Sequence, residues 1–181
     1  EYSYSYYSSY ASAFDGEGQI TSAISYVSSE DIPKLYALEG HRESELSDTL
    51  TDQIEKENLE VESLNLVSAG SVPEDAAAVI IHSPQTDLSQ EEAQMLLEYL
   101  QNGGNAFITS LYTGEEMPNF NSVLEYYGVT VMDGIVIEGD SDHYYPQNQI
   151  YLLPEIQSTS LTSSLVSDNR LVLMPISQAV E

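Results

Sequence analysis

The sequence predicts an α/β fold in which a mostly parallel sheet carries helices on both faces. The first observation is a short apolar run at residues 76–84, closed by Pro84, which is typical of a strand buried on both faces. The second is segment 85–101, in which apolar residues recur at helical spacing after the N-cap residue Ser89. The third is another apolar run at 106–111, directly after two glycines that end the helix. Strand, helix and strand in this order form a βαβ unit, whose crossover is right-handed.

The remaining elements are predicted from the same patterns. We expect strands at 34–41, 59–67, 129–137 and 171–174, with a short extended piece at 151–154. We expect amphipathic helices at 44–58 and 118–127, a helical turn or loop at 161–167, and a polar, aromatic loop at 138–150. The resulting order β-α-β-β-α-β-α-β is flavodoxin-like in outline.

The first thirty residues differ in composition from the rest. Residues 1–13 are rich in Tyr and Ser and favour disorder or an edge strand, and 19–27 have helical spacing after a turn at 15–18. We therefore expect an N-terminal extension with a short helix at 1–30 and a single α/β domain at 31–181. Because the chain starts at Glu1 rather than Met, we also expect it to be a piece of a longer protein.

The charge balance excludes several kinds of partner. Thirty acidic residues against four basic ones give a formal charge of -26, which repels nucleic acid phosphates and anionic lipid head groups. The absence of cysteine excludes disulfides, thiolate metal sites and cysteine nucleophiles. The sequence contains neither an apolar stretch long enough to cross a membrane nor a signal peptide pattern.

Ligands of such sheets bind beyond the carboxyl ends of the strands, so a binding site is expected in the four loops that follow them. These loops are residues 39–43, 82–87, 110–116 and 138–143. We expect a ligand-binding site there, with no catalytic residue, no metal and no cofactor. The candidate ligand-binding residues are Gly40, His41, Ser83, Tyr112, Asp140 and His143.

Each histidine has a functional and an ordinary interpretation. His41 could orient a ligand or act as an acid or base, but a loop histidine is more often simply exposed. His82 lies within an apolar run, where a core histidine with a satisfied hydrogen bond is the simpler interpretation. His143 follows Glu138, Asp140 and Asp142, which suits calcium, although the spacing matches no EF-hand and acid-rich loops are usually solvated.

Two classes of enzyme site have little support in the sequence. Ser83 occupies the strand-to-helix position of a hydrolase nucleophile, but its neighbours are His82 and Pro84 rather than the glycines that the strained turn needs. No Gly-rich dinucleotide or P-loop motif opens a helix. An acid/base hydrolase would require His41 or His143 to meet a carboxylate in one pocket.

Tyrosine offers a broad face with a polar tip, so a group of tyrosines could line a glycan or peptide groove. Tyr127 could instead be explained by the packing of the predicted helix that contains it. The tyrosines concerned are Tyr126, Tyr127, Tyr144, Tyr145 and Tyr151.

Several short motifs, in their order and spacing, resemble the GldG-like ABC transporter auxiliary family, which includes gliding-motility-associated transport components. The resemblance covers most of residues 14–140. Its motifs are Phe14-Asp-Gly-Glu-Gly-Gln-Ile-Thr-Ser-Ala-Ile24, Leu38-Glu-Gly-His41, Val72-Pro-Glu-Asp-Ala76, Leu88-Ser-Gln-Glu-Glu92, Tyr99-Leu-Gln-Asn-Gly-Gly104, and Asn121-Ser-Val-Leu124 with Gly128-Val129.

The resemblance implies a non-enzymatic domain with an amidotransferase-like fold that lacks the nucleophile. Such a domain would lie on the extracytoplasmic face of the cell membrane, held by flanking helices that this fragment does not contain, and would work with a permease and an ATPase. Arg42 departs from the pattern, since glycine is expected there. The alternative function is a secreted glycan- or peptide-binding α/β module.

Overall fold

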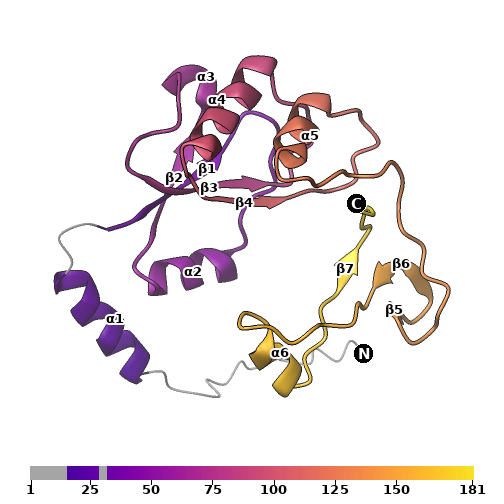
Figure 1. Ribbon diagram of the computed structural model, residues 1–181. Coiled ribbons are helices and arrows are strands. Elements are labelled where there is room, and N and C mark those ends of the chain that lie inside the picture. The colour runs from indigo at the N-terminus through magenta and orange to yellow at the C-terminus, as the bar shows by residue number, and fades with distance from the viewer. Residues whose placement is uncertain (1–15, 29–31) are drawn as a thin grey trace, which may run out of the picture.

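A computed structural model describes residues 16–28 and 32–181. Its centre is a four-stranded, all-parallel sheet in the order β2-β1-β3-β4 (Figure 1). The strands are β1 (Lys34–Leu38), β2 (Glu60–Leu64), β3 (Ala76–His82) and β4 (Ala106–Thr109). This sheet confirms the predicted α/β fold with a flavodoxin-like outline.

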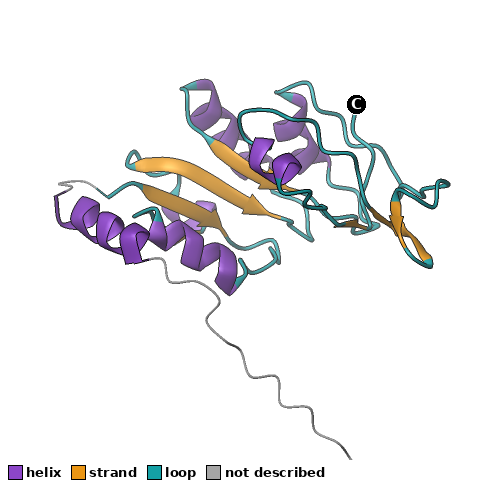
Figure 2. Ribbon diagram, turned by 90° about the horizontal axis from the view of Figure 1, so that it is seen from below, coloured by secondary structure: helices purple, strands orange, loops and turns teal. Residues whose placement is uncertain are grey.

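Helices cover both faces of the parallel sheet, as predicted. Figure 1 shows α3, α4 and α5 on one face and α2 on the other, and Figure 2 shows the same layers from below. Helix α1 is joined to the end of α2 through Ser22, whose hydroxyl donates to the Lys56 carbonyl at 2.7 Å. The helices are α1 (Gly16–Ser28), α2 (Asp48–Lys56), α3 (Leu66–Ala69), α4 (Gln90–Gln101) and α5 (Pro118–Glu125).

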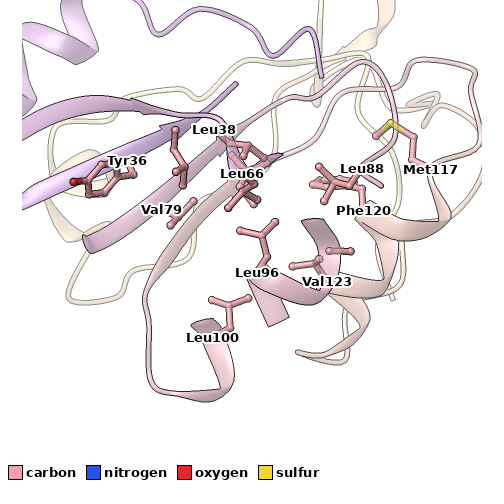
Figure 3. Packing of buried hydrophobic residues seen from close by; sticks show 13 residues of the cluster. Tyr36, Leu38, Leu66, Val79, Leu88, Leu96, Leu100, Met117, Phe120 and Val123 are labelled. Atoms are coloured by element: carbon pink, nitrogen blue, oxygen red, sulfur yellow. The ribbon is translucent and has the colours of Figure 1, made fainter. Parts of the chain in front are cut away.

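The main core lies between the sheet and the α3–α5 layer (Figure 3). Val79 and Ile81 of β3 are fully buried there against Leu96 of α4 and the α5 residues Phe120 and Val123. Ile80, which points to the opposite face, is only 4% exposed, so β3 is buried on both sides. This explains why its sequence is a continuous apolar run rather than an alternating one.

Local sequence signals fix both ends of α4. Ser89 and Glu92 form a reciprocal capping box, with the Ser89 hydroxyl accepting from the Glu92 amide and the Glu92 carboxylate accepting from the Ser89 amide. Beyond the helix, Gly103 has φ 91°. A Cβ at Gly104 would overlap the ring of Tyr99. Both glycines are therefore required where the chain turns into β4.

Three predicted strands are wrong or displaced. The second strand ends at Leu64 because Asn65 caps the short helix α3, accepting from the Ser68 amide at 3.0 Å. Segment 129–137 forms no strand. It pairs with the C-terminal segment through the antiparallel bridge between Val131 and Val180 and through backbone hydrogen bonds such as that from the Met132 amide to the Ala179 carbonyl. The last strand is limited to Met174–Pro175, because residues 171–173 lack strand pairing.

A second, antiparallel sheet in the order β5-β6-β7 includes residues of segment 138–150, for which a loop was predicted, and also parts of the predicted extended piece at 151–154 and strand at 171–174. Its strands are β5 (Tyr144–Tyr145), β6 (Asn148–Leu152) and β7 (Met174–Pro175), and α6 (Ser163–Ser167) lies between the last two. Gln147 turns β5 into β6 with φ 71°, a conformation for which the sequence offers no glycine. Within residues 16–28 and 32–181, no helix is long and apolar enough to cross a membrane.

Candidate functional site

The loops after β1 and β3 are bound to each other at the carboxyl edge of the sheet. The carbonyl of His41 accepts hydrogen bonds from the amides of Gln85 and Thr86, at 2.9 and 3.1 Å. In return, the Ser44 amide donates to the His82 carbonyl at 2.9 Å. The parallel pairing of β1 with β3 places these loops side by side, so Gly40, His41 and Ser83 lie in one region.

The loop after β1 depends on unusual backbone angles. Gly40 has φ 125°, and a Cβ there would lie 3.3 Å from the Asn65 side-chain nitrogen, so glycine suits this position. Arg42 has φ 55°, a left-handed conformation that glycine adopts without strain. Arg42 therefore replaces the glycine that the resemblance leads one to expect, yet keeps a backbone conformation that glycine favours.

His41 is buried between two carboxylates. The expectation that a loop histidine is simply exposed is therefore wrong for this residue. Its Nδ1 lies 3.0 Å from Glu43 Oε1, and its Nε2 lies 3.2 Å from Glu92 Oε2. The three side chains are between 5% and 9% exposed. A doubly protonated imidazole can donate to both carboxylates at once. Each ring nitrogen thus already has a partner within the protein.

The carboxylate of Glu92 serves two purposes at the start of α4. Burial raises the pKa of this carboxyl, but the hydrogen bonds from the Ser89 amide and hydroxyl, together with His41, outweigh burial and leave the pKa below its ordinary value. The ionised form is therefore the one that the folded protein stabilises. Glu92 caps the helix and binds the imidazole through the same oxygen.

Ser83 stands at the end of β3 in a strained conformation, with φ 51°. Its hydroxyl lies 3.0 Å from the Thr109 hydroxyl, which also lies 2.8 Å from His82 Nδ1. His82 thus has the satisfied hydrogen bond expected of a core histidine. The partner of the Ser83 hydroxyl is a threonine rather than a histidine, so the arrangement supplies no general base in contact with Ser83.

The loop after β4, residues 110–116, borders a cavity of about 500 Å³. Met117 and Phe120 border the cavity but belong to the core and are only 8% and 1% exposed, whereas Tyr112 contributes a half-buried ring. The opposite wall includes Val131 and Gln178, from segments that pair through the Val131–Val180 bridge. The other lining residues are Ser110, Thr113, Gly114, Glu115, Glu116, Pro118, Asn121, Met132 and Asp133.

Asp140 and His143 lie in the loop before β5 and interact with each other. His143 Nδ1 is 3.6 Å from Asp140 Oδ2, and its Nε2 is 3.7 Å from Glu155 Oε1. Both side chains are more than a third exposed. In the part of the chain that the structure describes, no three acidic or histidine side chains are arranged to hold a metal ion.

The predicted tyrosine group does not line the cavity beyond β4, to which Tyr112 alone among the described tyrosines contributes. Tyr126 and Tyr127 pack edge to face, with ring centroids 5.0 Å apart, at the end of α5. Tyr127 is 57% exposed, so packing of its own helix does not explain this residue.

The sequence reasoning missed several residues of this region. Glu92 was visible as the third residue of a capping box, but nothing in the sequence linked it to His41. Thr109 and Gln178 gave no signal, because their roles depend on strand pairing and on the return of the C-terminal segment.

Comparisons with known proteins agree with this architecture. A search of curated proteins found no match. Three chains of solved structures match, among them one described as "mmIFT52 N-terminal domain", with a TM-score of 0.60, 15% sequence identity, and coverage of 82% of this chain and 68% of that one. At this identity the likeness shows the fold alone. Residues 32–157 match the family described as "ABC-type uncharacterized transport system", an auxiliary transport family. The chain therefore belongs to this family of ABC-type transport auxiliary components.

Proposed function

We propose that this chain is a non-catalytic, extracytoplasmic accessory domain of an ABC-type transport system, of the GldG-like kind. It acts through contacts with the permease and ATPase subunits of that system or with a ligand. Family membership supports the transport role, and the motifs from Phe14 to Val129 support the closer relationship.

The contacts and burial of His41 are the observation that supports a non-catalytic role. A general base needs a nitrogen that can reach a substrate proton. Both nitrogens of His41 are instead directed to Glu43 and Glu92, and all three side chains are shielded from solvent. This arrangement is typical of a structural connection, here between the loop after β1 and the first turn of α4.

Two experiments test the proposal. The full-length protein, carrying an affinity tag, is expected to co-purify with the permease and ATPase encoded beside its gene, and with neither subunit of an unrelated transporter. Failure to retain either subunit in mild detergent would contradict the transport role.

The location can be tested by cysteine labelling, because this sequence contains no cysteine. Exposed Ser141, replaced as Ser141→Cys, is expected to react with a membrane-impermeant maleimide in intact cells. Reaction only after the cells are permeabilised would place the domain in the cytoplasm.

The secreted glycan- or peptide-binding module remains the second candidate. Exposed Tyr126 and Tyr127 are the observation in its favour. It has less support, because the large cavity contains neither of them.

A further inference from the structure

The cavity beyond β4 has the dimensions and construction of a ligand site. Its volume of about 500 Å³ falls within the range of small-molecule pockets, roughly 300–1,000 Å³. Its walls come from three separate parts of the chain, namely residues 110–121, residues 131–133 and Gln178. Hydrogen bonds join the second and third of these parts: Gln178 Nε2 donates to the Met132 carbonyl at 3.2 Å, and the Met132 amide donates to the Ala179 carbonyl at 2.9 Å.

The charge of the lining is entirely negative. Glu115, Glu116 and Asp133 are the charged residues among those that form the cavity. All four basic residues of the chain lie elsewhere. One of them, Lys34, is bound to Glu62 and Asp75 at 2.7 and 3.3 Å. A cation that entered the cavity would therefore meet carboxylates that have no cationic partner within the described residues.

The same cavity is poorly suited to a metal ion. Within residues 16–28 and 32–181, no three acidic or histidine side chains are placed so that they could hold one together. The lining residues Met132, which is 50% exposed, and Tyr112, which is half-buried, instead provide apolar surface, and an aromatic ring stabilises a neighbouring ammonium or guanidinium group. Carboxylates together with the accessible apolar side chains of Met132 and Tyr112 fit a cation carried on an organic body.

We infer that this cavity binds a small organic cation, an amine or guanidine attached to an apolar group. The apolar part would contact Met132 and Tyr112, and the charged end would face the carboxylates of Glu115, Glu116 and Asp133. The inference rests on the proposed function, since a domain that acts by contact rather than catalysis needs a ligand or partner. The strongly negative field of the whole chain further concentrates cations near the cavity mouth.

The test is a nuclear magnetic resonance titration of the purified chain with phenethylammonium at constant ionic strength. We expect saturable shifts of the amide signals of Thr113, Gly114 and Met132. The neutral analogue 2-phenylethanol is expected to bind at least about tenfold more weakly, because it lacks the charge. This measurement needs no transport subunit, so its failure is distinguishable from failure of the proposed function, which the co-purification reports.

A pair of matched variants separates the cavity from the general charge. Glu115→Gln with Glu116→Gln is expected to weaken phenethylammonium binding at least about tenfold. Asp52→Asn with Glu57→Gln removes the same charge from exposed positions on and beside α2 and is expected to leave binding unchanged. Thermal melting of both variants shows that each remains folded.

Four outcomes would overturn the inference. If both double variants bind phenethylammonium equally weakly, the amine is attracted only by the general negative charge. If 2-phenylethanol binds as tightly as phenethylammonium, the site is apolar and does not recognise charge. Stoichiometric displacement by Mg²⁺ would mean a metal site. Saturable shifts with a neutral disaccharide, but none with the amine, would mean a glycan site.

Discussion

His41 and Glu92 connect the loop after β1 to the first turn of α4 through a contact between residues 51 positions apart in the sequence. Since the imidazole and both neighbouring carboxylates are nearly inaccessible to solvent, removal of one of them leaves buried polar atoms without a hydrogen-bond partner. The three side chains therefore stabilise the fold as a set, in which each satisfies the hydrogen bonds of another.

Glu92→Gln tests this connection with little change of shape. The amide keeps an acceptor oxygen for the Ser89 amide but removes the charge that His41 faces. We expect the free energy of unfolding in urea to fall by about 1–3 kcal/mol. Glu91→Gln is the matched control, since Glu91 is exposed in the same first turn. An equal loss in both variants would mean that only the helix dipole is affected.

The lowered pKa of Glu92 predicts a dependence on pH. A carboxyl whose pKa is lower in the folded state stabilises the protein above its unfolded pKa, and this stabilisation is lost as the pH falls through the folded pKa. We therefore expect the difference in unfolding free energy between wild type and Glu92→Gln to shrink as the pH falls from about 6 to about 3. Relief of general repulsion at low pH affects both proteins and cancels in the difference. A difference that stays constant would contradict the prediction.

At the scale of elements, Asp87 connects the loop before α4 to the start of α5. Its carboxylate accepts from the Asn119 amide at 3.1 Å and from the Phe120 amide at 2.9 Å, where Met117 at the N-cap position provides no side-chain cap. This is an N-cap supplied from 32 residues upstream. It fixes the helix that carries Phe120 and Val123 into the core.

Asp87→Ala is expected to lower the free energy of unfolding by about 1–2 kcal/mol, since two amides at a helix start lose their acceptor. Asp87→Asn, which keeps one acceptor oxygen, should lose less. Urea unfolding of the three proteins checks the order. Equal stability of Asp87→Ala and wild type would show that water replaces the cap without loss.

The elements predicted well are those that short-range signals define. Helix α4 was expected from its Ser89 cap and its apolar spacing, and β3 from a continuous apolar run, because burial on both faces leaves no polar alternation. Segment 129–137 has equally apolar residues but pairs with the C-terminal segment, a partner that its own sequence does not specify. The burial of His41 was missed for the same reason, since Glu92 is remote in sequence.

At the scale of the whole molecule, the dominant property is the formal charge of -26. Few of these charges are compensated, because the chain has only four basic residues. Self-repulsion of this size opposes the compact state, while it keeps molecules apart in solution. The sheet and its helices must therefore remain folded against an unfavourable electrostatic term.

Added salt screens this repulsion and should stabilise the fold. At neutral pH, raising NaCl from about 0.02 M to about 0.2 M shortens the Debye length from roughly 20 Å to less than 10 Å. We expect the melting temperature to rise by about 2–4 °C, which corresponds to about 1 kcal/mol for a domain of this size. The control is the same salt series near the isoelectric pH of about 4.1, where the net charge approaches zero and the rise should disappear. An unchanged melting temperature at neutral pH, or an equal rise at both pH values, would mean that salt acts on hydration rather than on repulsion between carboxylates.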